Sequence, residues 1–337
     1  MRYFKALTAA ATAALALTFS PAQAAEKRTM CVFDIIGANG DIYNIMKDYK
    51  TAALGWGVDL ELKPYTDEKI ASEDLKAGQC EAAVLTGIRG RQFNSYTGSM
   101  DSIGSIPSYD AMRTVITVLA SGNPSINKHL VSGPYEVGGV APMGAAYLFV
   151  KDRTIDTVGE LSGKSIAVLE YDTAQANMAS RVGMSPVMSD ITNFSGRFNN
   201  GSVDICFAPI AAYSALELYK GMQPDGGIVD YVLGQLTAQV ILKKDEFPDG
   251  FAQKSREYML GQFDRAMRVI ENANSEVDKK WWIRIPEADK LRYDEMMREA
   301  RIALTKEGVY DKEMMSLLRK VRCKMDASRA ECVNPVE

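Results

Sequence analysis

Two arginines offer the clearest binding chemistry in the sequence. Arg89 and Arg91 lie in the segment Thr86–Phe93, directly after the apolar run Glu81–Leu85, which predicts a short strand. A guanidinium holds a planar anion such as a carboxylate through two parallel hydrogen bonds. We therefore expect both side chains at the mouth of a crevice, where they bind a ligand anion or, with equal weight, form salt bridges to Asp or Glu residues elsewhere.

Other candidate ligand contacts follow the ends of other predicted strands. Asn39 and Asp41 come after the strand Met30–Ile36, although Asp41 suits the N-cap of the next helix better than a ligand contact. Tyr171 and Asp172 occupy the matching turn of a second unit, where Tyr171 can stack on a ligand and Asp172 can cap a helix. Three further residues complete the proposed ligand-binding rim, with core packing as the alternative for each: Tyr147, Pro209 and Tyr213.

Enzyme chemistry has no positive signal in the sequence. His129 is the single histidine, and the chain contains no G-x-S-x-G, H-E-x-x-H or C-x-x-C motif. The segment Gly159–Ser165 has three residues between its glycines, where a phosphate-binding loop needs four, and it precedes a strand instead of following one. We predict a protein that is not an enzyme, with no catalytic residues, no metal site and no cofactor.

The elements that must position these residues form a repeated pattern. Gly78 and Gly201 each close a predicted helix, and an acidic residue then introduces a short apolar strand. The first copy has β-α-β-α-β order within Met30–Leu85, which is typical of a parallel sheet. The second copy has strands at Ser165–Leu169 and Asp204–Ala208. Because open α/β sheets bind ligands beyond the carboxyl ends of their strands, two crevices should face each other.

The predicted fold class is therefore α/β, with two doubly wound sheets joined by crossing strands. The runs Ala145–Val150 and Thr237–Leu242 suit these crossing strands, and amphipathic helices after Pro248 should pack across both lobes. The chain divides into a signal peptide at 1–24, lobe I at 25–146, lobe II at 147–240, and a return strand with C-terminal helices at 241–337.

The first residues predict export. Arg2 and Lys5 precede the uncharged run Ala6–Phe19, and Pro21–Ala24 supplies a cleavage site of small residues. We expect a soluble periplasmic protein whose mature chain begins near Ala25. Its 37 basic and 43 acidic residues give a net charge of −6, which disfavours nucleic acid as a partner.

The five cysteines in an oxidising compartment suggest two disulfides and one free thiol. Cys31 lies on the first predicted strand and Cys80 at the start of the third, and such strands are commonly neighbours, so we expect a Cys31–Cys80 disulfide. Cys323 and Cys332 close a short C-terminal loop, which a disulfide stabilises by roughly 2–3 kcal/mol. Cys206 then remains as a buried free thiol.

Several segments together resemble one transport family. Glu160–Ile166, Asn200–Asp204 and Leu242–Pro248, followed by long helices, are similar to the substrate-binding proteins of TRAP transporters of the DctP type. The resemblance extends over most of residues 30–320. Within this family, the segments Cys31–Asp34, Gly40–Tyr43 and Thr86–Phe93 more closely resemble a subgroup of solute-binding proteins labelled AdeT-like.

The resemblance implies a two-lobed, type II-like periplasmic binding protein. Such a protein captures a small polar solute between lobes that close about a hinge, and presents it to a membrane permease. Typical TRAP proteins carry a carboxylate-gripping arginine on a second-lobe strand, where this chain has Ala167, and an asparagine where it has Ala208. Either Arg89 or Arg91 replaces that arginine, or the ligand is not a simple organic acid.

A second function remains open beside solute uptake. The two-lobed protein can instead serve as an accessory or sensing subunit of a membrane transport or efflux assembly. In that case Trp281 or Trp282 contacts the membrane partner, although packing among the late helices suits both side chains better.

Overall fold

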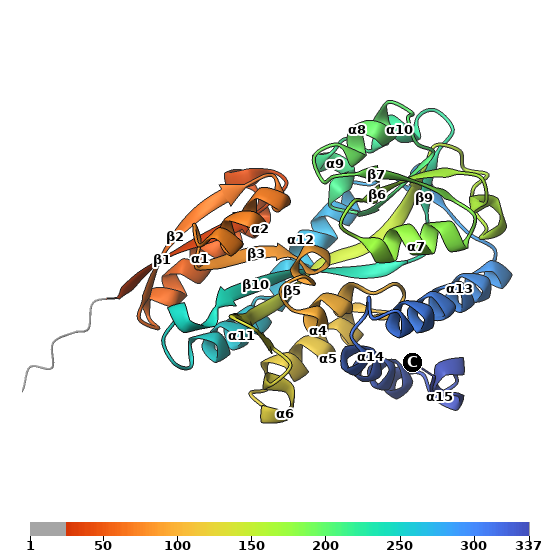
Figure 1. The fold of residues 1–337 in the computed structure, drawn as a ribbon. Coiled ribbons are helices and arrows are strands. Elements are labelled where there is room, and N and C mark those ends of the chain that lie inside the picture. The colour runs from red at the N-terminus through yellow and green to blue at the C-terminus, as the bar shows by residue number, and fades with distance from the viewer. Residues whose placement is uncertain (1–24, 337) are drawn as a thin grey trace, which may run out of the picture.

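The computed structural model describes residues 25–336 as two α/β halves joined by long strands (Figure 1). The predicted signal peptide at 1–24 lies outside the described residues. Within the described part of the chain, no helix combines the length and the apolar character that a membrane crossing requires.

The first half, here called lobe I, is a parallel unit. Its main elements are β1 (Glu26–Phe33), α1 (Asp41–Leu54), β2 (Val58–Tyr65), α2 (Glu68–Ala77) and β3 (Ala82–Thr86). β1 pairs in parallel with both β2 and β3. Gly78 ends α2 at φ +76°, and its N–H donates to the Asp74 and Leu75 carbonyls. The disulfide Cys31–Cys80 ties β1 to the chain just before β3, which confirms that predicted pairing.

The second half, here called lobe II, repeats the plan. Its main elements are β6 (Ser165–Leu169), α7 (Thr173–Arg181), β7 (Ser185–Ser189), α8 (Phe194–Asn199) and β8 (Ile205–Pro209). β6 pairs in parallel with β7 and β8. Gly201, at φ +80°, closes the turn after α8 as predicted. Cys206 lies buried on β8 as the expected free thiol.

Two long strands carry the chain between the lobes. β5 (Tyr135–Val150) and β10 (Gly234–Lys243) pair antiparallel, with register shifts between Leu236 and Thr237 and between Val240 and Ile241. β10 also pairs with β3, and β5 with β8, so hydrogen bonding continues from one lobe into the other. The result is one eleven-stranded sheet whose main path runs β2-β1-β3-β10-β5-β8-β6-β7. The two expected sheets are thus continuous through the crossing strands.

The remaining elements cover this framework. Between β3 and β5 lie α3 (Gly87–Gly90), α4 (Ser95–Gly98), α5 (Tyr109–Ala120), α6 (Pro124–Asn127) and β4 (Val131–Ser132). After β8 of lobe II come α9 (Ala212–Ala215), α10 (Tyr219–Met222) and β9 (Gly227–Val229). The C-terminal part contains α11 (Phe251–Gly261), α12 (Phe263–Ser275), β11 (Trp282–Ile283), α13 (Glu287–Lys306), α14 (Lys312–Met325) and α15 (Ala330–Val333).

The late helices contact both lobes, as the sequence predicts. Arg181 of α7 forms an ion pair at 2.9 Å with Glu307, directly after α13. On the lobe I side, the Ser102 hydroxyl donates to Met315 Sδ of α14 at 3.3 Å. Figure 1 accordingly places α13 beneath α7 and α14 beside α5. The second predicted disulfide, Cys323–Cys332, is confirmed and joins α14 to α15.

Candidate binding site

A cavity of about 530 Å³ lies between the two lobes. Its lining comes from the carboxyl ends of β1, β3, β6 and β8, from both crossing strands, and from α1 and α12. This is the position where α/β sheets bind their ligands. A volume of this size suits a drug-sized molecule.

The cavity lining is mainly apolar. Lobe I contributes Ile42 and Ile45 of α1, and lobe II contributes Leu169, Phe194 and Phe207. The polar or ionisable lining residues are Asp34, Asp41, Thr86, Tyr171, Gln175, Ser214, Asn272 and Glu276. The residues that line this cavity include no Lys, Arg or His.

Asp34 organises the first turn of α1 at one wall of the cavity. Its Oδ1 accepts the Ile36 N–H at 2.9 Å and its Oδ2 accepts the Tyr43 N–H at 3.2 Å. A Cβ at residue 40 would lie 1.9 Å from Asp34 Oδ1, so only Gly40 lets the chain pass this close. Burial raises the Asp34 pKa, and the backbone hydrogen bonds oppose that rise. The Asp34 carboxylate thus satisfies one N–H in the turn after β1 and one N–H that the start of α1 otherwise leaves unpaired.

Arg89 lies in a buried contact between the lobes and is absent from the cavity lining. α3 directly follows β3, and the Arg89 Cζ lies 3.3 Å from the centroid of the Tyr171 ring. The Tyr171 hydroxyl donates to Glu68 Oε2 at 3.0 Å, and Arg89 Nε lies 3.9 Å from the same oxygen. Burial raises the pKa of Glu68, while hydrogen bonds from Thr86 oppose the rise.

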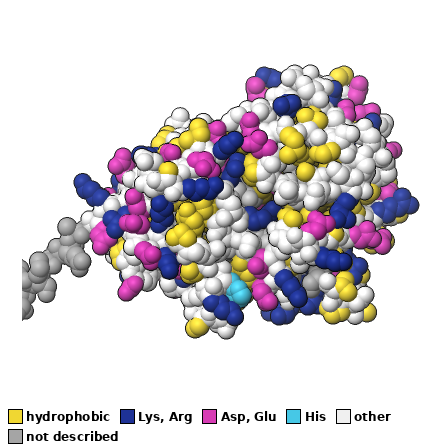
Figure 2. Space-filling model, viewed as in Figure 1, with side chains coloured by type: hydrophobic (Ala, Val, Ile, Leu, Met, Phe, Trp, Pro, Cys, Tyr) yellow, Lys and Arg dark blue, Asp and Glu magenta, His cyan; other side chains and the backbone are white. Residues whose placement is uncertain are grey.

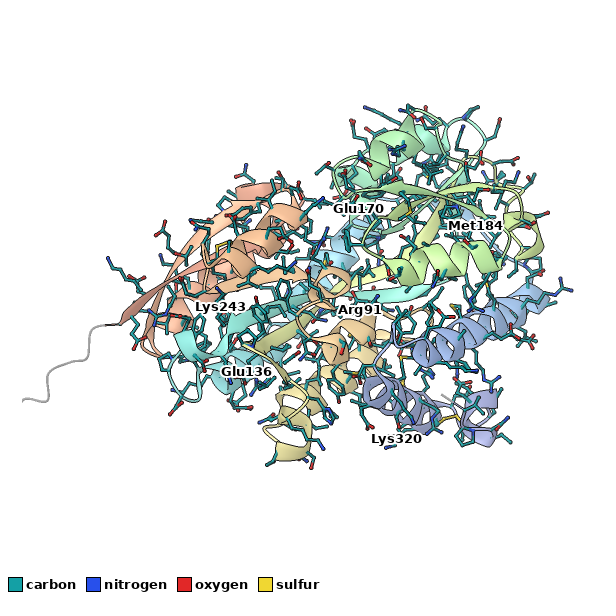
Figure 3. The ribbon with its side chains drawn as sticks, in the orientation of Figure 1. Arg91, Glu136, Glu170, Met184, Lys243 and Lys320 are labelled. Atoms are coloured by element: carbon teal, nitrogen blue, oxygen red, sulfur yellow. A yellow bond between two sulfur atoms is a disulfide. The ribbon has the colours of Figure 1, made fainter. Side chains whose placement is uncertain are left out.

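Two further ion pairs cross between the lobes. Arg91 Nη1 lies 3.3 Å from Asp172 Oδ1 in a mostly buried pair, and Lys69 Nζ lies 3.2 Å from Glu170 Oε1 in an exposed pair. Figure 3 labels Arg91 and Glu170 near the meeting point of the lobes, and Figure 2 shows side chains of both charges there. We call the residues of these contacts the interlobe rim: Glu68, Lys69, Arg89, Arg91, Glu170, Tyr171 and Asp172.

Asp101 is a buried carboxyl group that interacts electrostatically with the rim. Its Oδ1 accepts the Thr237 hydroxyl at 2.6 Å and its Oδ2 accepts the Thr237 N–H at 3.1 Å. A Cβ at residue 87 would lie 2.5 Å from Asp101 Oδ1, which explains Gly87 at the start of α3. Burial raises the pKa of Asp101 to about 7; Arg91 lowers it and Asp172 raises it.

The structure separates the sequence-predicted ligand contacts into three groups. Asp41, Tyr171 and Pro209 line the cavity, so their contact with a ligand stays a prediction. Arg89, Arg91 and Asp172 are brought together, but in contacts with oppositely charged or aromatic side chains of the rim. Arg89 and Arg91 thus both form salt bridges to acidic residues, which is one of the two roles expected for them.

The remaining three predicted contacts lie outside the cavity lining. Asn39 is exposed in the turn before α1. The Tyr147 ring packs edge-on against Trp282, with centroids 5.2 Å apart. Tyr213 is buried in the core of lobe II, with its ring 5.7 Å from that of Tyr219. Tyr147 and Tyr213 thus pack against other aromatic side chains, which is the alternative role expected for both.

Sequence reasoning missed the apolar character of the site. Ile36 lines the cavity from the turn after β1 and is 54% exposed, which is unusual for isoleucine. Ile42 and Ile45 look like core residues of an amphipathic helix, but both line the cavity from α1. The sequence did contain a signal for this apolar lining: apolar residues such as Ile36 follow the end of a strand, where polar ligand contacts were expected.

The fold and the cavity define a class of protein. Two α/β lobes, joined by crossing strands and enclosing a cavity at the carboxyl ends of both sets of strands, form a solute-binding protein. Residues 51–336 match the family described as Solute-binding protein AdeT 1/2, and the chain belongs to that family.

A curated relative supports the same assignment. The chain is 46% identical over 301 residues to the "Probable solute-binding protein AdeT1" of Acinetobacter baumannii. The match covers 89% of this chain and 98% of that protein. The predicted membership of the AdeT-like group is thereby confirmed.

Solved structures share the fold at low sequence identity. One is a TRAP periplasmic solute-binding protein from Desulfovibrio salexigens with bound orotic acid, at TM-score 0.74 and 16% identity, covering 89% of this chain and 99% of that one. Another, from Haemophilus influenzae with bound L-gulonate, has TM-score 0.73 and 11% identity, covering 88% and 99%. The predicted two-lobed TRAP-type fold is confirmed.

Proposed function

We propose that this protein binds a small solute in the periplasm and delivers it to a membrane permease. The observation that carries the proposal is the cavity of about 530 Å³ lined by both lobes. A ligand that contacts both walls favours the closed arrangement over an open one, because it binds the closed state better. The family assignment and the TRAP-type fold support delivery to a membrane protein.

We propose that the described arrangement is the closed one, with lobe I at 25–146 and lobe II at 147–240. Three rim contacts cross between the lobes and hold their facing edges together. The register shift between Leu236 and Thr237 of β10, opposite Gly144 and Pro142 of β5, suits a hinge because pairing there is already irregular.

The alternative role in a sensing or efflux assembly lacks a supporting observation. Its docking hypothesis needs exposed tryptophans, but Trp281 is 9% exposed and Trp282 packs against Tyr147. We also propose a non-catalytic role, which the assignment to a family of solute-binding proteins supports.

Native mass spectrometry of the protein purified from its own periplasm tests this function. We expect a chain that begins near Ala25 and carries a bound small molecule, which denaturation releases. Addition of that molecule to stripped protein should raise the free energy of unfolding by about 2.7 kcal/mol at 100 times its Kd. Recovery in the cytoplasm, or a stripped protein that no periplasmic extract stabilises, would contradict the proposal.

The membrane partner needs a separate experiment. Cross-linking in intact cells should join the loaded protein to an integral membrane protein, and less so the stripped protein. Equal cross-linking of both forms would contradict delivery of solute and favour a sensing or structural role.

A further inference from the structure

The chemistry of the cavity restricts the ligand further than the proposed function, on which this inference rests. The sequence suggests a polar solute, whereas the walls are mostly aliphatic and aromatic, as with Ile42, Ile45, Phe194 and Phe207. Such walls match an apolar ligand body, because burial of apolar surface provides most of the binding free energy in a site of this kind.

The groups that could hold a ligand carboxylate are engaged elsewhere. Arg89 and Arg91 contact Tyr171 and Asp172 of the other lobe, Arg89 also pairs with Glu68 of its own lobe, and neither arginine lines the cavity. Ala167, which does line it, presents only a methyl group.

The α1 N-terminus, which otherwise attracts anions, is likewise engaged. Its first turn already donates to the buried carboxylate of Asp34. A ligand carboxylate would therefore lose its hydration without gaining a cationic partner from the lining.

Two carboxylates lie where the cavity meets solvent. Asp41 and Glu276 both line the cavity and are solvent-exposed. Within residues 25–336, neither side chain forms a hydrogen bond or an ion pair. Glu276 also directly follows α12, whose C-terminal end carries partial negative charge. Both features favour a cationic group at the edge of an apolar cavity.

We propose that the cavity takes an apolar organic cation. An alkyl or aryl body fills the space between the lobes, and an ammonium group remains at the solvent edge, where the carboxylates of Asp41 and Glu276 supply negative charge. The ligand class is thus set by an apolar interior with an acidic edge, and the matching carboxylate is rejected.

Three probes that share a phenylbutyl group and differ in their polar head group test the proposal. Stripped protein is titrated calorimetrically with 4-phenylbutylamine, 4-phenylbutanol and 4-phenylbutyrate at low salt. We expect the amine to bind about tenfold or more tightly than the carboxylate, with the alcohol between them. The amine's advantage should shrink as added salt screens the exposed carboxylates.

Variants locate the two parts of the site. Asp41→Asn combined with Glu276→Gln should reduce the ratio of amine to carboxylate affinity at least fivefold. Glu295→Gln, an exposed residue of α13 outside the cavity lining, is the matched control and should leave the ratio unchanged. Ala273→Phe, which adds a ring to the cavity wall, should weaken all three probes alike.

The outcomes distinguish this inference from the proposed function. Tighter binding of 4-phenylbutyrate than of 4-phenylbutylamine, or release of an anionic molecule from the native protein, overturns the cationic class but leaves solute binding intact. Absence of binding by all three probes together with absence of any native ligand overturns both. A preference for the amine that the double variant leaves unchanged overturns the role of Asp41 and Glu276.

Discussion

The interlobe rim and the cavity are neighbouring parts of one interface with opposite chemistry. The rim joins Arg89, Arg91 and Lys69 of lobe I to acidic and aromatic side chains of lobe II or its own lobe. The cavity is lined mostly by apolar side chains and by no basic ones. Tyr171 is the residue common to both.

This difference separates closure of the lobes from recognition of the ligand. Lobe-to-lobe ion pairs in the rim add to the stability of the closed arrangement, and their contribution does not depend on which solute is bound. The cavity then selects the solute by apolar fit and by the acidic edge. Variants of rim residues should therefore change the stability of the protein and the closure of its lobes. They should leave unchanged the relative affinities for ligands with different head groups, because the cavity determines these.

Removal of the buried rim carboxylate should have the largest effect. Glu68→Ala leaves Arg89 buried with Tyr171 but without its acidic partner, and leaves the Thr86 N–H without the acceptor it has at 2.5 Å. Loss of one member of a buried ion pair costs roughly 3–5 kcal/mol. Urea denaturation should show this loss in the free energy of unfolding.

Glu73→Ala on the same helix is the control for that variant. Glu73 forms an exposed pair with Lys76, and its loss should cost less than about 1 kcal/mol. Equal losses for Glu68→Ala and Glu73→Ala would show that the buried rim contributes no more than the surface.

Asp101 should make the rim side of the interface sensitive to pH. Its folded pKa of about 7 lies above the ordinary value of 3.8, so the folded state holds the proton more tightly. The resulting stability is fully present below about pH 4 and is lost as the pH rises through 7, by up to about 4 kcal/mol.

Urea denaturation at pH 5 and pH 8 measures this contribution. The free energy of unfolding of the natural protein, relative to that of Asp101→Asn, should decrease from pH 5 to pH 8. An identical pH dependence in both proteins would exclude Asp101 as its source.

The framework of the molecule was predictable from local sequence signals. Gly78 and Gly201 mark helix ends because a left-handed turn there favours glycine, and both adopt positive φ. Cys31 and Cys80 could be paired because parallel neighbours in a sheet follow from β-α-β order. β7 was missed because Ser185–Ser189 has no clear apolar alternation.

The site was less predictable because its contacts join distant segments. Arg91 and Asp172 are 81 positions apart in the sequence, and nothing local to either shows that they meet. The turns carrying them were correctly placed at facing strand ends. Whether a guanidinium meets a ligand or a carboxylate of the other lobe depends on how the lobes close, which sequence spacing does not encode.

Tyr171→Phe, at the residue common to the rim and the cavity, should lower the free energy of unfolding by an intermediate amount. The variant removes the hydroxyl that donates to Glu68 and keeps the ring beneath Arg89, so the cavity keeps its shape. A hydrogen bond to a charged group contributes about 1.5–3 kcal/mol, which urea denaturation should detect. The ranking of the three phenylbutyl probes should not change; a reversal would show that rim and cavity are coupled through Tyr171.

Lys69→Ala should have the smallest effect, because its pair with Glu170 lies at the solvent edge of the rim. The two side chains are 60% and 46% exposed, unlike those of Arg91 and Asp172, which are 13% and 9% exposed. We expect a loss below about 1 kcal/mol that disappears near 1 M salt, where the screening length falls to about 3 Å.

Small-angle scattering of the stripped proteins distinguishes the two ion pairs. Lys69→Ala should keep the scattering profile of the stripped natural protein, whereas Arg91→Ala leaves Asp172 mostly buried without its cation and should shift the population further toward open lobes. If Lys69→Ala opens the lobes as far as Arg91→Ala does, burial does not determine which rim contacts hold the protein closed.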